Sequence, residues 1–189
     1  MHIRHITLAD AQAVLDIYKP YIETTAITFE TSVPTVEDFT GRIIAYTEKY
    51  PWLVAEENGK IAGYAYASKH REREAYQWCV ESSAYVHASF QHTGVASRLY
   101  TELFSILKAC GYINVYAGIT LPNPKSYAFH TKMGFTDVGI YKNIGYKMGK
   151  WHDVAWLVKN INDHSNDPMA PKKFNKEQDV EVSDTTKAK

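Results

Sequence analysis

The chain has 189 residues, of which 45% are hydrophobic and 13% aromatic, and its 21 basic side chains balance 21 acidic ones. This composition supports one folded domain with a substantial core, and the zero net charge argues against bulk binding to nucleic acid or to an anionic membrane. No apolar run approaches the roughly 20 residues that a membrane span needs, and the N-terminus lacks the apolar block of a signal peptide. Cys79 and Cys110 show no spacing typical of a disulfide framework or zinc site. We therefore expect a cytoplasmic protein with reduced thiols.

The first part of the chain predicts a strand, two helices and a hairpin. Residues 2–7 alternate apolar and polar side chains as a half-buried strand does, and apolar residues then recur at helical spacing. Pro20 is expected to end or kink this first helix. Thr35, followed three residues later by Asp38, has the pattern that starts a second helix. The turn pair Asn58-Gly59 between two apolar runs predicts a hairpin.

The second part predicts a strand and a helix repeated twice, followed by two strands. A long strand leads into a helix stripe that ends at Gly111, a residue suited to the position after a helix. The remaining elements are expected at 113–119, 126–132, 135–140 and 153–159, with a loop at 145–152. The order β-α-α-β-β-β-α-β-α-β-β predicts a mixed α/β domain.

The C-terminal residues differ in composition from the rest of the chain. Prolines, lysines and scattered polar residues surround few apolar side chains after residue 162. We therefore expect a domain over 1–162 and a solvated, largely disordered tail over 163–189.

The segment Gln91-His92-Thr93-Gly94 joins the long strand at 76–86 to the following helix. A glycine in a tight loop directly before a helix lets several backbone N–H groups point outward, where the helix dipole favours an anion. A phosphate or pyrophosphate fits such a site. An ordinary strand-to-helix turn is the alternative when the loop is considered by itself.

Several segments together resemble the Gcn5-related N-acetyltransferase (GNAT) superfamily, and within it the phosphinothricin N-acetyltransferase branch. The loop from Gln91 to Ala96 is similar to the acetyl-CoA signature Q/R-x-x-G-x-G/A of the superfamily. Segments typical of the narrower branch lie at 24–31, 78–86, 121–126, 129–135 and 149–154. The resemblance spans about residues 1–160 and excludes the tail.

The resemblance implies a fold and a cofactor. The expected architecture is a central, mostly antiparallel sheet that splays between its fourth and fifth strands and is flanked by helices. The resemblance implies that acetyl-CoA is the co-substrate, that no metal is required and that the protein is a homodimer. The expected coenzyme A contacts are the loop residues His92, Thr93, Gly94, Val95, Ala96 and Ser97, the strand backbone of Ala84, Tyr85 and Val86, and Asn123.

Glu81 is the expected general base. A substrate ammonium must lose a proton before its nitrogen can attack a thioester, and a carboxylate near a partly apolar cleft can accept that proton. The alternative is an exposed strand glutamate in a surface pair, which the resemblance disfavours.

His130 stands where the wider superfamily usually has tyrosine, and the phosphinothricin branch has histidine there. Two roles remain open for it: protonating the departing thiolate, or sharing proton transfer with Glu81. A packed helix histidine is the alternative.

The resemblance implies that Arg73 and Tyr76 lie near the acceptor site, and the Arg73 guanidinium suits a substrate carboxylate. Phe29, Glu30 and Thr31 are candidate walls of the acceptor cleft, although Phe29 suits a core position equally well. Lys69 and Arg71 are interpreted as solvated. Trp151-His152-Asp153 is rejected as a metal or triad fragment, because neighbouring strand residues point to opposite faces.

The sequence therefore predicts an acetyl-CoA-dependent N-acetyltransferase that acts on the α-amino group of a small amino acid or analogue, such as phosphinothricin or methionine sulfoximine. A protein N-terminus or a polyamine is an alternative acceptor. A non-catalytic acyl-CoA sensor is an alternative of a different class, and the presence of both Glu81 and His130 argues against it.

Overall fold

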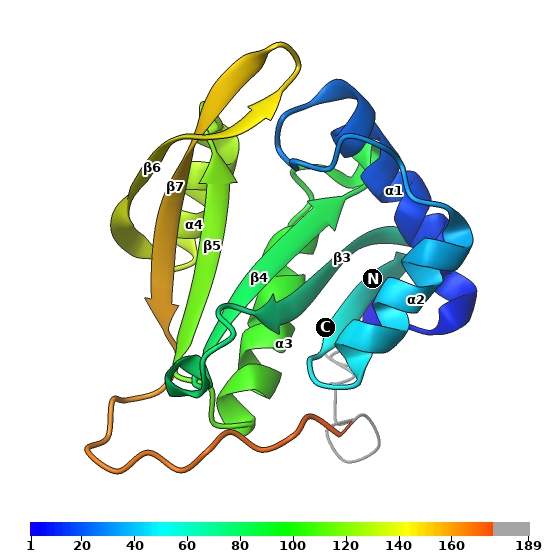
Figure 1. Ribbon diagram of the computed structural model, residues 1–189. Coiled ribbons are helices and arrows are strands. Elements are labelled where there is room, and N and C mark those ends of the chain that lie inside the picture. The colour runs from blue at the N-terminus through cyan, green and yellow to red at the C-terminus, as the bar shows by residue number, and fades with distance from the viewer. Residues whose placement is uncertain (176–189) are drawn as a thin grey trace.

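The computed structural model describes residues 1–175, and its α-helices and strands follow the predicted order (Figure 1). The prediction that residues 176–189 belong to a disordered tail lies outside the described residues. The elements are β1 (His2–His5), α1 (Ala11–Thr24), α2 (Val36–Thr47), β2 (Trp52–Glu57), β3 (Lys60–Lys69), β4 (Cys79–Val86), α3 (Val95–Ala109), β5 (Asn114–Thr120), α4 (Pro124–Lys132), β6 (Thr136–Lys147) and β7 (Lys150–Asn160).

One seven-stranded sheet has the order β1-β2-β3-β4-β5-β7-β6, and only the β4–β5 pair is parallel. The β4–β5 pairing begins at Cys79 opposite Asn114 and stops at Glu81 opposite Tyr116, although both strands continue. The two strands therefore part beyond Glu81, as Figure 1 shows. The predicted splayed, mostly antiparallel sheet is confirmed.

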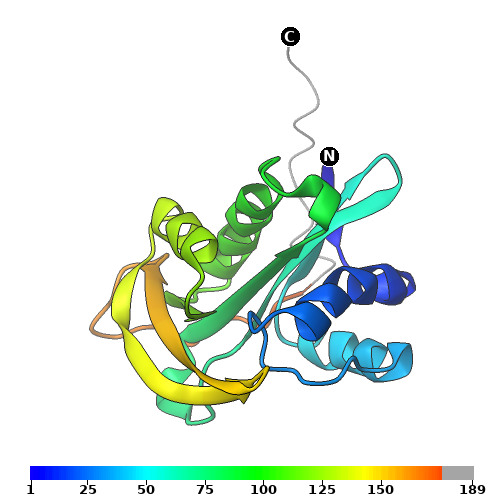
Figure 2. The same ribbon diagram turned by 90° about the horizontal axis from the view of Figure 1, so that it is seen from above.

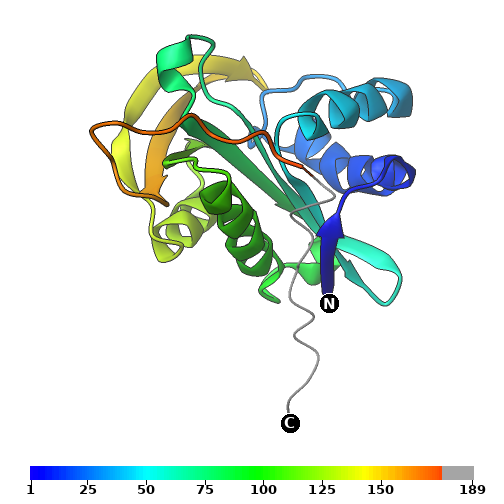
Figure 3. The same ribbon diagram turned by 90° about the horizontal axis from the view of Figure 1, so that it is seen from below.

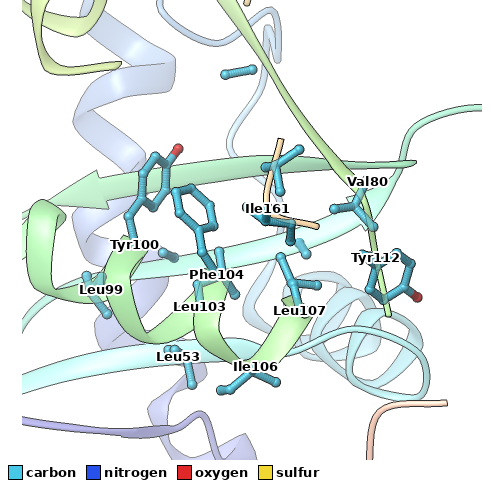
Figure 4. Packing of buried hydrophobic residues seen from close by; sticks show 14 of the residues in the cluster. Leu53, Val80, Leu99, Tyr100, Leu103, Phe104, Ile106, Leu107, Tyr112 and Ile161 are labelled. Atoms are coloured by element: carbon cyan, nitrogen blue, oxygen red, sulfur yellow. The ribbon is translucent and has the colours of Figure 1, made fainter. Parts of the chain in front are cut away.

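The helices cover both faces of the sheet. Figure 2 shows α1 and α2 on one face and α3 with α4 on the other. The apolar stripe of α3 buries Leu99, Tyr100, Leu103 and Leu107 against the sheet, each at most 1% exposed (Figure 4). A second cluster on the opposite face joins α1 and α2 to Trp52 and other strand residues. This two-sided burial fixes which strand residues face which layer.

Helix α1 continues through Pro20 to Thr24, so the predicted end of the helix at Pro20 is wrong. Proline removes one backbone donor and costs a mid-helix bond. Tyr18 and Ile22 on either side of it are buried in the core, at 5% and 2% exposure. Burial of this apolar face offsets the lost bond.

The two last strands are longer than predicted. The expected loop at 145–152 is instead the end of a hairpin, whose turn residues Met148 and Gly149 have φ values of +52° and +78°. Tyr146 and Trp151 face each other across the strands with ring centroids 5.4 Å apart. Such cross-strand aromatic pairs extend a hairpin beyond what alternation alone predicts.

Residues 163–175 run along the domain, and most of their side chains are exposed, while Phe174 is buried. Figure 3 shows the segment running beneath the sheet. Phe174 is only 5% exposed and lies 5.2 Å from the ring of His5, while the Trp78 indole donates to the Met169 carbonyl. Within the described chain, no helix is long and apolar enough to cross a membrane.

Candidate active site

Glu81 lies at the last paired position of β4, where the strand separates from β5. Side chains alternate along a strand, so Glu81 shares a face with Tyr85, whose ring contacts Tyr18 and Tyr21 of α1. The neighbouring Ser82 points to the opposite face. Glu81 therefore faces the α1–α2 side of the sheet at the point where the strands open.

His70 is the direct partner of Glu81. Its Nδ1 lies 2.9 Å from Oε1 of the glutamate, and the side chains are 11% and 33% exposed respectively. The imidazole ring stacks on Tyr116 of β5 with centroids 4.3 Å apart and an interplanar angle of 6°. The predicted base is thus held by a residue that the sequence interpretation did not single out.

Aromatic side chains surround this pair. Trp156 of β7 presents its ring edge-on to His70 at 5.8 Å, and Tyr141 of β6 lies 5.8 Å from Trp156. Arg71 is exposed, as expected of a solvated side chain, and also donates to the Tyr141 hydroxyl at 3.1 Å. Lys69 is paired with Glu72 at the surface.

His130 lies on the other face of the sheet from Glu81. Its Nδ1 donates to the Ser126 carbonyl at 2.8 Å, which leaves Nε2 to accept from the Tyr100 hydroxyl at 3.2 Å. Ser82 in turn donates to that hydroxyl at 3.3 Å. The structure therefore links His130 to β4 through Tyr100 and does not bring it together with Glu81.

Burial governs the ionisation of His130 and of its hydrogen-bond partner Tyr100. Burial lowers the pKa of His130, and the hydrogen bond to Ser126 offsets this only in part. Burial also raises the pKa of Tyr100 to about 12, against a smaller opposing effect of Ser82. Near neutral pH the pair is a neutral imidazole and a protonated hydroxyl, with three aromatic rings around the histidine: Tyr100, Phe129 and Phe135.

The second half of β4 has a partner on one side only. Residues 82–86 pair with β3, whereas the ladder to β5 has already ended. Ala84, Tyr85 and Val86 therefore border the gap between the strands, where the sequence predicted a thioester contact. At the last residue of β4, the Val86 carbonyl accepts a hydrogen bond of 2.8 Å from the Tyr21 hydroxyl.

The loop at 91–94 ends in a helix terminus that fits an anion. Gly94 has φ +86° and is the N-cap of α3, and no side chain of the described residues caps this terminus. Val95, Ala96 and Ser97 supply N–H groups in the first turn, where intrahelical acceptors are lacking. Gly94 is exposed, and His92, two residues earlier, also has a positive φ of +65°. The residues present thus fit the pyrophosphate of acetyl-CoA.

A cavity of about 440 Å³ lies between the end of α1, the end of β5 and the tip of the β6–β7 hairpin. Thr120 in its wall is four residues beyond Tyr116 on the same strand face, or about 13 Å along β5. Asn123 also lines the cavity, and its side-chain oxygen accepts from the Ser126 N–H as the N-cap of α4. Asn123, predicted as a cofactor contact, therefore has a structural role as the cap of α4.

Phe29 and Glu30 lie in the loop between α1 and α2. Phe29 is 37% exposed, 6.2 Å from the His152 ring, and so close to Gly145 that an added Cβ there would lie 2.2 Å from it. Glu30 is ion-paired with Arg42 of α2. Phe29 thus links the α1 side of the opening to the β6–β7 hairpin, while the Glu30 carboxylate is already ion-paired.

Arg73 and Tyr76 lie in the short 3-10 turn between β3 and β4. Tyr76 is 43% exposed, and its ring meets His70 edge-on at 6.5 Å. Arg73 is exposed three residues earlier. On β7, His152 is buried and hydrogen-bonded to the Lys147 carbonyl, whereas Asp153 bonds Lys142 and Asn143, so the two diverge as expected.

Comparison with known proteins identifies the family. A family model described as "Acetyltransferase (GNAT) domain" matches residues 3–156. The chain belongs to the GNAT acetyltransferase family. The sheet that splays at β4 and β5 and the open helix terminus of α3 are the fold features expected of this family.

Two relatives within the GNAT family show which kind of acetyltransferase the chain is similar to. The chain is 42% identical over 161 residues to a phosphinothricin N-acetyltransferase from Streptomyces viridochromogenes, covering 85% of this chain and 88% of that protein. It is 32% identical over 170 residues to an L-methionine sulfoximine/L-methionine sulfone acetyltransferase from Salmonella typhimurium, covering 87% and 97%. These likenesses bear out the predicted N-acetyltransferase class.

A solved structure of a GNAT protein has the same fold as this chain. The phosphinothricin acetyltransferase from Sinorhizobium meliloti in complex with acetyl-CoA superposes with a TM-score of 0.84 at 31% identity, covering 89% of this chain and 92% of that one. The predicted fold is confirmed.

Sequence reasoning missed three residues that contact the predicted site residues: His70, Tyr100 and Tyr21. Tyr100 lies on a predicted helix but outside the apolar stripe predicted for it, and Tyr21 lies beyond Pro20, where the first helix is expected to end or kink. His70 lies in a charged loop that offers no periodic signal. Only the fold brings it to Glu81, 11 residues further along the chain.

Proposed function

We propose that this enzyme transfers the acetyl group of acetyl-CoA to the α-amino group of a small amino acid or analogue of the phosphinothricin or methionine sulfoximine type. The observation that carries the proposal is the Glu81 carboxylate at the parting of β4 and β5, on the open, aromatic-lined face. The relatives named above support the acceptor class.

When bound, acetyl-CoA supplies the thioester at which the C–N bond forms and the C–S bond breaks, so that coenzyme A leaves as a thiolate. Glu81 takes one proton from the substrate ammonium and frees the nitrogen lone pair for attack. The nitrogen loses a second proton after attack, and the thiolate takes up one. The products are the amide, the coenzyme A thiol and one proton.

The backbone has two further roles in this mechanism. The N–H groups at the α3 terminus, with Gly94 at the cap, hold the pyrophosphate. The unpaired edge of β4 at 84–86 holds the thioester end, where N–H groups stabilise developing negative charge on the carbonyl oxygen.

The acceptor is assigned to the α1–α2 face of the sheet. Arg73 and Tyr76, beside His70, would hold its carboxylate, and Phe29 would form a wall from the opposite side. Glu30 acts indirectly in this proposal, because its ion pair with Arg42 fixes the loop that carries Phe29.

In this proposal His130 takes no part in proton transfer from the amine and has a structural role instead. Burial lowers its pKa, its Nδ1 proton is bound to the Ser126 carbonyl, and its Nε2 accepts a hydrogen bond and carries no proton to donate near neutral pH. Its contact with Tyr100 fixes β4 through Ser82.

We also propose a cytoplasmic homodimer that binds neither nucleic acid nor membrane. The edge strand β6 and its neighbour β7 expose several large apolar side chains, which is unusual for a monomer surface: Val138, Ile140, Ile144, Tyr146 and Trp151. The absence of a disulfide at Cys79 and Cys110 within residues 1–175 suits a reducing compartment. Light scattering of the purified chain should give twice the chain mass.

The deciding experiment is an acceptor panel with acetyl-CoA held constant and thiol release measured. Phosphinothricin and methionine sulfoximine should give the highest kcat/KM, above common amino acids, polyamines and a peptide N-terminus. Preference for a polyamine or peptide would replace the proposed acceptor. Stoichiometric binding of acetyl-CoA without turnover of any amine would favour a sensor.

The role of Glu81 is tested by Glu81→Gln, which keeps the shape and removes the base. We expect kcat to fall by about 10²–10⁴-fold, the usual contribution of a general base, while acetyl-CoA affinity changes less than threefold. Calorimetry measures the affinity and thiol release the rate. Equal losses in both would mean that Glu81 is structural.

A further inference from the structure

We propose that His70 is a positioning residue for the base, holding the Glu81 carboxylate so that one oxygen faces the substrate ammonium. This inference rests on the proposed function, because it assigns His70 a role only through Glu81. No step of the mechanism above uses His70.

The hydrogen bond divides the two oxygens of Glu81. His70 Nδ1 is 2.9 Å from Oε1, and the other oxygen, Oε2, has no hydrogen-bond partner among residues 1–175. Oε1 is thus occupied by the protein and Oε2 is available to the substrate. An anchored carboxylate loses less rotamer freedom when it meets the ammonium than a free one does.

The imidazole is itself held on several sides. It stacks on Tyr116, the residue of β5 that pairs with Glu81 at the end of the parallel ladder. Trp156 and Tyr76 meet it edge-on at 5.8 Å and 6.5 Å, and the side chain is 11% exposed. His70 therefore bridges β4 and β5 at the point where they separate.

The local chain path explains how His70 reaches this position. Strand β3 pairs with β4 up to Lys69 opposite Val80, and the chain then leaves the sheet. His70 is the first residue after the strand, so its side chain turns over the face that carries Glu81 and Tyr116. The following turn at Glu74–Tyr76 covers its outer edge.

Ring packing alone would not require a histidine. A phenylalanine satisfies the stack on Tyr116 equally well, but it cannot donate a hydrogen bond to a carboxylate. The two functions of the side chain can therefore be separated. His70→Phe keeps the ring and removes the donor, whereas His70→Asn keeps an N–H donor two bonds from Cβ, as in Nδ1, and removes the ring.

The test measures kcat and KM for these variants and for a double-mutant cycle with Glu81→Gln in the full chain. We expect His70→Phe to lower kcat at least tenfold with the KM for acetyl-CoA within twofold of wild type. His70→Asn should recover most of that loss. The double variant His70→Phe/Glu81→Gln should be no slower than Glu81→Gln alone, because His70 acts only through the carboxylate.

Distinct outcomes separate this inference from the proposed function. Losses that multiply in the double variant, or a His70→Asn enzyme as slow as His70→Phe, would overturn the role of His70 while leaving Glu81 as the base. Unchanged kcat in Glu81→Gln would overturn both. If His70→Phe lowers the thermal midpoint sharply, Tyr116→Leu provides a second variant: it loosens the imidazole, and an unchanged kcat in it contradicts the proposal.

Discussion

Gly94 combines a required backbone conformation with an exposed position at the coenzyme loop. Its φ of +86° costs an L-residue about 1–2 kcal/mol, although an added Cβ would meet no atom within 4 Å. We expect Gly94→Ala to weaken acetyl-CoA binding roughly tenfold, because the loop relaxes away from the geometry that presents its N–H groups. Isothermal calorimetry with acetyl-CoA measures this.

The matched control is Gly59→Ala in the β2–β3 turn, where φ is +73° and the space is also open. Both variants should lose similar stability, but only Gly94→Ala should lose affinity. A loss of acetyl-CoA affinity in both would show that general destabilisation, and not the loop, is responsible.

Asp10 provides a pH-dependent contribution to stability. Burial raises its pKa, but hydrogen bonds from Arg4 and Thr7 outweigh this and hold the pKa at about 2. An unfolded aspartate titrates near pH 4, so the native state favours the ionised form. This stabilisation is complete above about pH 4 and is lost as the pH falls through about 2.

Urea unfolding at several pH values checks this expectation. Wild type should exceed Asp10→Asn in free energy of unfolding by about 1.5–3 kcal/mol at pH 6, the range for a hydrogen bond to a charged group. The difference should shrink between pH 4 and pH 2. A difference that stays constant over this range would contradict the assignment.

At the scale of secondary-structure elements, helix α2 contains an avoidable weakness. Gly41 lies at an exposed interior position, where a Cβ meets no atom within 4 Å. Gly41→Ala should raise the free energy of unfolding by about 0.5–1 kcal/mol, because alanine loses less backbone entropy in a helix. Thermal or urea unfolding measures the gain.

Gly63 in β3 is the contrasting control, because a Cβ there would lie 2.8 Å from the Tyr85 carbonyl oxygen. Gly63→Ala should be destabilising, since a backbone atom cannot move away cheaply. Equal effects of the two substitutions would mean that close packing between β3 and β4 is not what selects glycine at 63.

Local signals predicted some elements well and failed at others. The hairpin at Asn58-Gly59 and the Thr35 cap of α2 follow from contacts within a few residues, and Thr35 does accept from the Asp38 N–H at 3.1 Å. The length of β6 and β7 depends on pairing between strands. The continuation of α1 through Pro20 depends on burial of its apolar face in the core. Such long-range effects have no signature in a short window.

At the scale of the whole molecule, the C-terminal segment at 163–175 packs against the domain near β1. Phe174 is 5% exposed, against 85% for Met169 in the same segment. Phe174→Ala should lower the free energy of unfolding by roughly 3 kcal/mol, the lower end for removing a buried phenylalanine, since the segment can detach locally. Urea unfolding of the full chain measures the loss.

Met169→Ala is the matched control and should change stability by less than about 0.5 kcal/mol, as exposed substitutions usually do. Its carbonyl still accepts the Trp78 hydrogen bond, because that contact uses the backbone. Equal and small effects of the two variants would mean that the segment is not held by Phe174.

The sequence by itself determined the order of elements and the glycine loop before α3, because these depend on periodicity and turn chemistry along the chain, and the family resemblance pointed to Glu81 as the candidate base. Tertiary structure decided which of the candidate residues meet. The parting of β4 and β5 leaves Glu81 on one face of the sheet and His130 on the other, and the end of β3 turns His70 over Glu81. Strand alternation assigns faces only relative to neighbours in the same strand, so convergence between loops, strands and helices becomes visible only once the sheet is assembled.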